Sequence, residues 1–197
     1  MAEVIEAEKF VLRDSNGSSR AELKVDGGLG TSMLWLADKD GRIGASMSVW
    51  DDGLRKLELS DENATRAELT LRADNQVQLL MRDKSWAPRA AVQVEPDGRP
   101  FLQVSDKNGK LRAELFLAKN DTPWLSFYER DKNRKFIAGM GVAKDGSVAL
   151  ALTDRDEKSY AELRVPRGGV PHMRFLDMKG KVLWSTPEPG KPSEPGK

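Results

Sequence analysis

Five short acidic clusters in the sequence have the spacing of oxygen ligands that could surround a calcium ion. They are DSNG at 14–17, DKDG at 38–41, DENA at 61–64, DKNG at 106–109 and DRDE at 154–157. None has the distal glutamate of a complete EF-hand loop, and Lys39, Lys107 and Lys132 stand within such loops. Asp, Asn and Gly are also the residues of tight turns, because they bond nearby backbone or accept a positive φ. The clusters therefore predict hairpin turns without a metal.

Residues for catalysis are scarce. His172 is the single histidine and there is no cysteine, so a usual zinc site lacks ligands and a Ser–His–Asp triad would rest on one residue. GGLG at 27–30 and RGG at 167–169 lack the lysine and the following helix of a phosphate-binding loop. With 31 acidic residues, some pair of carboxylates is expected to lie at a catalytic distance by chance. A hydrolase with paired carboxylates is therefore the weakest alternative. We predict no catalytic residue, no cofactor and no enzyme activity.

Four aromatic residues are the best candidates for binding. They are Trp35, Trp124, Tyr128 and Phe116. Each alternates out of phase with the aliphatic residues of its segment, as Trp35 does between Leu34 and Leu36. Rings on the face opposite a core offer a partner large apolar area with a polar edge. The pattern predicts a binding patch for a protein or a carbohydrate, unless the rings fill space between neighbouring elements of the fold.

The segments that carry these residues repeat along the chain. Arg-Ala-Glu-Leu begins at 20, 66 and 112 and Tyr-Ala-Glu-Leu begins at 160, so the copies stand 46, 46 and 48 residues apart. Weaker copies lie midway between these, namely GASM at 44–47, RAAV at 89–92 and IAGM at 137–140, and a last one, KVLW at 181–184, stands at the end. The chain therefore contains eight copies of a repeat of about 23 residues.

Each copy has the pattern of two short strands joined by a turn. Apolar residues alternate with polar ones, as Ala113, Leu115 and Leu117 do after the DKNG turn. A lone hairpin cannot bury its apolar face, whereas stacked copies share a core. We predict an all-β protein, an antiparallel meander of about eight hairpin repeats. Its predicted core contains Ala21, Leu23, Val25, Leu69, Leu115 and Leu163.

Odd and even copies differ on the face opposite the predicted core. In odd copies this face is charged, as at Arg20 and Glu22, whereas even copies have small residues such as Ser46, Gly139 and Gly141. Hairpins covered on both sides would explain the small residues. The pattern favours a propeller-like form with four blades, each pairing an even copy with the next odd one. A flattened barrel or sandwich is the next alternative, and a solenoid fits less well because the turns are tight.

Charge and composition limit the partners and the location. Lys+Arg 32 against Asp+Glu 31 gives a net charge of +1, so no basic excess favours nucleic-acid binding. No apolar stretch is long enough to insert in a membrane, and the acidic start MAEVIEAEKF is unlike a signal peptide. We predict a soluble cytoplasmic protein, with one β domain at 1–186 and a disordered Pro/Glu/Gly/Lys tail at 187–197. A leader removed earlier would leave no trace in this sequence.

The pattern L-x-L-x-D-x-x-G-K-x-R-A-x-L recurs over residues 10–186 and closes with DMKGKVLWSTP. It resembles a family of uncharacterised bacterial proteins made of such hairpins. The resemblance implies the hairpin fold and transfers no catalytic or ligand residue. We interpret the chain as a non-enzymatic structural or adaptor protein that presents a rigid β surface to a protein partner or larger assembly. A carbohydrate-binding module is the first alternative, and the sequence also allows an oligomer.

Overall fold

The structure is a computed structural model that describes residues 6–129, 136–154, 159–177 and 179–186 of the chain. All regular structure in these residues is β-strand, in agreement with the predicted all-β class. The first eight strands are β1 (Lys9–Arg13), β2 (Ser19–Asp26), β3 (Thr31–Ala37), β4 (Ile43–Trp50), β5 (Arg55–Ser60), β6 (Thr65–Leu71), β7 (Val77–Arg82) and β8 (Pro88–Val94). The next eight are β9 (Pro100–Ser105), β10 (Leu111–Leu117), β11 (Pro123–Tyr128), β12 (Phe136–Val142), β13 (Val148–Thr153), β14 (Ser159–Val165), β15 (His172–Asp177) and β16 (Val182–Thr186).

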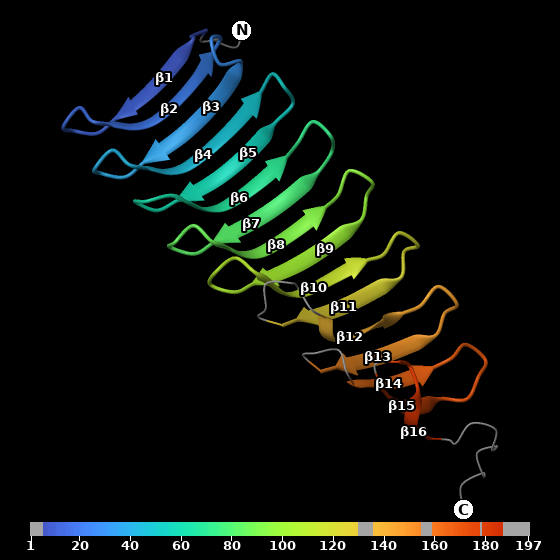
Figure 1. Ribbon diagram of the computed structural model, residues 1–197. Coiled ribbons are helices and arrows are strands. Elements are labelled where there is room, and N and C mark those ends of the chain that lie inside the picture. The colour runs from blue at the N-terminus through green and yellow to red at the C-terminus, as the bar shows by residue number, and fades with distance from the viewer. Residues whose placement is uncertain (1–5, 130–135, 155–158, 178, 187–197) are drawn as a thin grey trace, which may run out of the picture. The chain divides into compact units, whose positions relative to one another are not determined.

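The chain divides into two compact units. Unit 1 comprises Met1–Gly98 with Lys107–Gly109, and unit 2 comprises Arg99–Asp106 with Lys110–Lys197. Strands β1–β8 lie side by side in unit 1 and β9–β16 in unit 2, each strand antiparallel to its sequence neighbours within the unit (Figure 1). The antiparallel hairpin meander is thus confirmed. The tail predicted to be disordered, at 187–197, lies outside the described residues.

Four of the five acidic clusters form the predicted hairpin turns, whereas residues 155–157 of the fifth, DRDE, lie outside the described residues. In the first, the N–H of Asp14 donates to the carbonyl of Ser18 (3.0 Å) and the N–H of Gly17 donates to the carbonyl of Asp14 (3.0 Å). Gly17 has a φ of 81°, which an L side chain rarely adopts. Asn75 and Trp86 take the corresponding place in two later turns, with φ of 68° and 65°. The strand pairs beside several of these turns contain a register shift, or β-bulge, which is common next to short hairpin loops with a positive φ.

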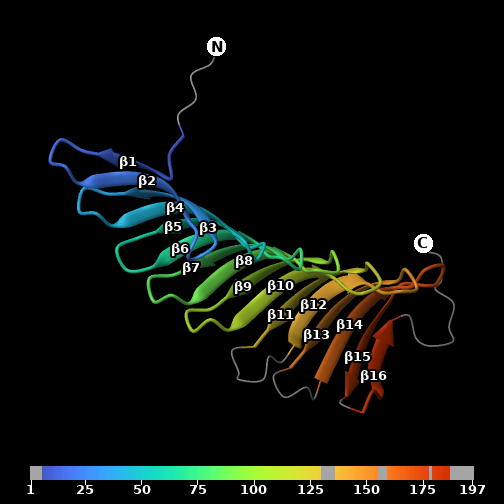
Figure 2. The same cartoon turned by 90° about the horizontal axis from the view of Figure 1, so that it is seen from above.

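The four-bladed arrangement is not observed. Blades would need breaks in the ladder between β2 and β3, β6 and β7, β10 and β11, and β14 and β15. All four of these strand pairs are hydrogen-bonded in continuous antiparallel register. Neither unit closes into a barrel, because no described pairing joins β1 to β8 or β9 to β16. Each unit is an open sheet. Figure 2, a second view of the same ribbon, again shows the strands of each unit side by side in chain order.

The predicted core residues lie on one face, as expected, but that face is not covered. Leu23, Leu69 and Leu115 are 51%, 45% and 50% exposed. Among the described residues the only buried apolar ones are alanines, whereas polar Thr70 and Ser126 on the other face are 4% and 5% exposed. A sandwich is therefore excluded within either unit, since a second layer would bury the leucines. The prediction that these residues form a covered core was wrong. Alternating apolar and polar residues show which side chains share a face, but they do not show whether a second layer covers that face.

Candidate functional site

Each of the four residues in the repeated Arg-Ala-Glu-Leu motif has its own place on the surface of the sheet. Its arginine joins one hairpin to the next: the Nε of Arg20 donates to the carbonyl of Ala37 (3.1 Å), and that of Arg66 to the carbonyl of Arg82 (3.0 Å). The same arginine also pairs with the aspartate of the preceding turn. These pairs are Asp14–Arg20, Asp61–Arg66, Asp83–Arg89 and Asp106–Arg112. In these four hairpins the arginine thus connects the turn to the strand that follows it.

The glutamate of the motif connects three neighbouring strands on the same face as the arginine. Glu68 lies 3.0 Å from Arg82 on β7 and 4.0 Å from Lys56 on β5. Glu22 lies 2.8 Å from Lys9, whose hydrogen bond lowers the pKa of Glu22 against the raising effect of partial burial. We call this side of each sheet the polar face. Its carboxylates are engaged in structural ion pairs.

The turn aspartates are occupied by their own backbone. Oδ1 of Asp38 accepts hydrogen bonds from the N–H groups of Asp40 (2.9 Å) and Arg42 (3.0 Å). The pKa of Asp38 is lowered mainly by the Arg42 backbone N–H, and that of Asp61 by the backbone N–H groups of Asn63 and Ala64. Within the described ranges no group of three or more His, Asp or Glu residues is arranged to hold a metal ion.

The alanine and leucine of the motif point to the opposite side of each sheet, which we call the apolar face. Register partners form three rows across it, a central row, a second row and a marginal row that contains Val49, Arg55 and Leu71 in unit 1. In unit 1 the central row is Phe10, Leu23, Leu34, Met47, Leu57, Leu69, Leu79 and Val92, and in unit 2 it is Leu102, Leu115, Leu125, Met140, Leu150, Leu163 and Met173. Most of these side chains are between 37% and 53% exposed, so they touch each other and leave their outer halves free.

The second row alternates large and small side chains, except at its end in unit 2, where Trp184 follows Phe175. In unit 1 it reads Leu12, Ala21, Leu36, Ala45, Leu59, Ala67, Met81 and Ala90. In unit 2 it reads Val104, Ala113, Phe127, Ala138, Leu152, Ala161, Phe175 and Trp184. The last two of these rings stack, with centroids 5.1 Å apart. The conserved position of alanine within the repeat therefore produces ridges and hollows along the sheet.

The four aromatic residues predicted to bind a partner all lie on the polar face. The structure brings two of them together in unit 2, where Phe116 on β10 is the register partner of Trp124 on β11. Tyr128 lies on the same face, four residues further along β11. Tyr128 donates a hydrogen bond to Glu114. Trp35 is in unit 1, beside Glu22 and Ser46 in the ladder. All four side chains are half-buried, so they form no fully exposed patch.

Small residues of the even copies make room for these rings within a single layer. A Cβ added to Gly141 would lie 2.5 Å from Trp124 Cδ2 and 2.7 Å from the Pro123 carbonyl oxygen. One added to Gly139 would lie 2.7 Å from Phe136 Cε2. The Trp124 ring therefore lies against the backbone of β12 at Gly141. This contact, and not a second layer, explains the glycine at position 141.

Sequence reasoning missed Phe101, which extends the aromatic row. Phe101 on β9 is the register partner of Phe116, so the row runs Phe101, Phe116, Trp124, Gly141 across β9–β12. Its alternation with Leu102 was the signal that could have found it. The exposed apolar face was missed for a different reason, because its residues were assigned to a core.

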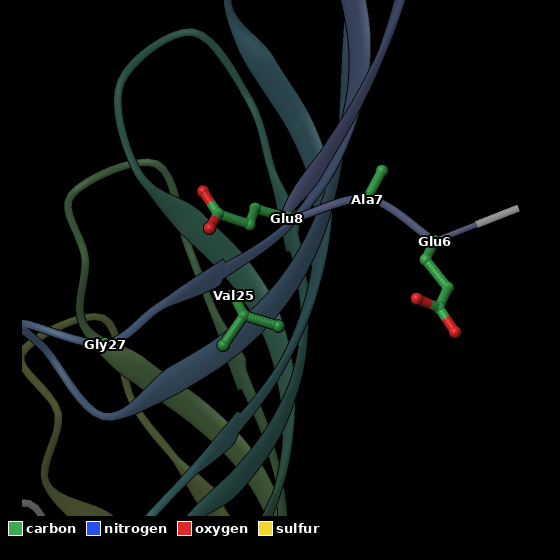
Figure 3. A pocket seen from close by; sticks show the side chains of 5 residues that line it. All are labelled: Glu6, Ala7, Glu8, Val25 and Gly27. Carbon is green, nitrogen blue, oxygen red and sulfur yellow. The ribbon is translucent and has the colours of Figure 1, made fainter.

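Groups that could serve a hydrolase do not converge. His172 on β15 has its Nε2 3.7 Å from Glu162, which is paired with Arg174 at 3.0 Å. The hollow beside the start of the chain is lined by Glu6, Ala7, Glu8, Val25 and Gly27. Figure 3 shows the carboxylates of Glu6 and Glu8 pointing away from each other. These groups form no pair that flanks a common point.

No family model matches the chain, and no curated protein sequence matches it. Among solved structures, the chain is similar to the SAS-4 (dCPAP) TCP domain of Drosophila melanogaster, solved in complex with a proline-rich motif of Ana2 (dSTIL). The identity is 12%, the TM-score is 0.44, and the match covers 88% of this chain and 95% of that chain. The part of this chain that the structure describes contains no helix with the length and hydropathy of a membrane span.

Proposed function

We propose that the chain is a non-enzymatic adaptor or scaffold protein that acts by burying its apolar face against another protein molecule. One observation carries the proposal: the central apolar row of each unit is uncovered, with Leu57 and Leu150 48% and 42% exposed. An uncovered face of this kind is typical of interaction sites, because exposed apolar area has a free-energy cost that a partner removes.

The size of the face supports the same function. Eight strands about 4.8 Å apart, each presenting about 20 Å of length, give roughly 750 Å² of face per unit. Monomeric proteins rarely expose a contiguous apolar patch larger than about 300–600 Å². Each unit alone therefore offers enough area for a specific protein contact.

The state of the carboxylates supports a non-enzymatic role. Glu58 and Glu68 face each other across β5 and β6, as a pair of catalytic carboxylates would. Lys56 lies 3.1 Å from Glu58, and Arg82 lies 3.0 Å from Glu68. Both carboxylates are thus engaged by cations, in the manner of a structural network.

Thiol labelling tests the proposal directly, because the chain has no cysteine of its own. Leu57→Cys places a thiol on the apolar face, and Leu29→Cys places one in the turn after β2, where the native side chain is 61% exposed. In cleared lysate of the native cells, we expect the Leu57→Cys thiol to react at least about tenfold more slowly than the Leu29→Cys thiol. Equal reaction rates in the lysate would refute the proposal.

A carbohydrate-binding module is a second candidate, carried by the aromatic row Phe101, Phe116 and Trp124 on the polar face of unit 2. Planar rings in a row can stack on successive sugar rings. A glycan array tests this role: binding that Trp124→Ala removes and Trp86→Ala leaves intact would support it. The absence of any glycan signal would exclude it for the sugars on the array.

A further inference from the structure

The apolar face fits a second copy of the same face. In the row Leu12, Ala21, Leu36, Ala45, Leu59, Ala67, Met81, Ala90 of unit 1, large residues occupy the odd strands and alanines the even strands. Adjacent strands are about 4.8 Å apart, so ridges recur about every 10 Å with a hollow between them. A surface with regular ridges and hollows is self-complementary when a copy is displaced by one strand.

A two-fold axis provides this displacement for all strands at once. If the axis runs along the strands between β4 and β5, it reverses the strand order and sets each odd strand over an even one. Leu36 then faces the alanine at 67 of the second copy, and Leu59 faces the alanine at 45. Rotation about this axis does not shift the row along the strand direction. Every large side chain of the row therefore meets an alanine of the second copy. The central row, from Phe10 to Val92, closes against its own copy in the same arrangement.

Area and charge agree with this partner. The roughly 750 Å² of one unit's face matches the approximately 800 Å² that each partner buries in an interface of standard size. On β5, Arg55 is the register partner of Val49 and Leu71 at the margin of the face, and its guanidinium donates to the carbonyl of Gly53 in the adjoining turn (2.9 Å). The central and second rows contain no charged residue. No charge is therefore left unpaired at the centre of a symmetric contact.

We propose that the apolar face of unit 1 is covered by the same face of a second copy of this chain, which gives a two-layer β-sandwich made of two molecules. The inference rests on the proposed function, because both use the apolar face. It is narrower, since it names this chain as the protein that covers the face. The polar faces, with their ion pairs, are then the outer surfaces of the dimer.

The oligomeric state of the purified full chain is the first test. Sedimentation equilibrium should show a monomer–dimer equilibrium that ends at twice the mass of the chain. Leu57→Glu should raise the dimer dissociation constant at least about 100-fold, because it buries two carboxylates in an apolar interface. The control Leu29→Glu makes the same chemical change in an exposed turn and should leave the constant within about twofold.

Crosslinking tests the register. Leu36→Cys with Ala67→Cys should give a covalent dimer on oxidation, because these positions face each other only between copies. They are on β3 and β6 and are not register partners within a chain. Each single variant should crosslink at least about tenfold more slowly, since neither position meets itself across the axis.

Three results would overturn the inference. They are a monomer at all concentrations up to about 100 µM, masses that grow beyond the dimer through strand edges, and single variants that crosslink as fast as the double variant. A monomer in which the Leu57→Cys thiol is nevertheless protected in native lysate would leave the proposed function standing with a different partner. Fast reaction of the Leu57→Cys thiol both in the purified chain and in native lysate would refute both proposals.

Discussion

Truncation of Leu115 measures how much support the apolar face receives within one chain. Leu115→Ala removes three carbons, which at about 0.8 kcal/mol per buried methylene amounts to about 2.4 kcal/mol for a fully buried side chain. Leu115 is 50% exposed, and no closed cavity would remain where its outer half faces solvent. We therefore expect a loss of about 1.2 kcal/mol in the free energy of unfolding, below the roughly 2–5 kcal/mol of a leucine truncated in a closed core.

Urea denaturation followed by tryptophan fluorescence, at concentrations low enough to keep the chain monomeric, is the assay. Leu29→Ala in the exposed turn is the control and should change stability by less than about 0.5 kcal/mol. A loss above about 2 kcal/mol for Leu115→Ala would mean that another part of the chain covers the face, contrary to the open sheet. A loss below about 0.5 kcal/mol would mean that the assigned strand phase is wrong.

Three further predictions concern the polar face and the turns. Gly141→Ala should cost about 1–3 kcal/mol, because its Cβ would meet the Trp124 ring and a backbone oxygen. Gly44→Ala, whose Cβ would have its nearest neighbour at 4.0 Å, should be neutral or stabilising by about 0.5–1 kcal/mol, and equal losses in the two variants would contradict the assigned packing. The pKa values of Asp38 and Asp61 are lowered from 3.8, so their contribution is present above pH 3.8 and is lost as the pH falls further. Asn at both positions keeps the turn acceptor and should flatten the decline of the urea midpoint between about pH 4 and pH 2, whereas an unchanged decline would mean that other carboxyls cause it. Calcium should leave the melting temperature unchanged, and a rise that chelator reverses would show that the aspartate turns bind the ion.

The local structure of this chain was largely predictable from its sequence. The acidic clusters specify tight turns, because Asp38 and its equivalents accept backbone N–H groups and a glycine takes the positive φ. Alternation between these turns specifies which residues share a face, and Leu23 and Leu115 lie on the same face of their respective units as predicted.

The sequence did not predict in the same way whether a second layer covers each apolar face. Alternating apolar and polar residues are equally consistent with a closed core and with an interface that a second molecule completes. The small residues of even copies were also ambiguous, because Gly141 under the Trp124 ring has the same sequence pattern as a glycine between two layers. The candidate patch of four aromatic residues was located on the correct strands, but register alone decided that Phe116 and Trp124 are neighbours while Trp35 is in the other unit.

The central claim is that the apolar face, and not the polar one, is open in the single chain. Leu69 and Thr70 are adjacent on β6 and point to opposite faces, with exposed fractions of 45% and 4%. Leu69→Cys and Thr70→Cys in the dilute, purified chain therefore compare the two faces at one place in the sheet. We predict that the thiol at 69 reacts with a water-soluble reagent at least about fivefold faster than the thiol at 70. A faster reaction at 70, as an ordinary protein with buried leucines and exposed threonines would give, would contradict the account.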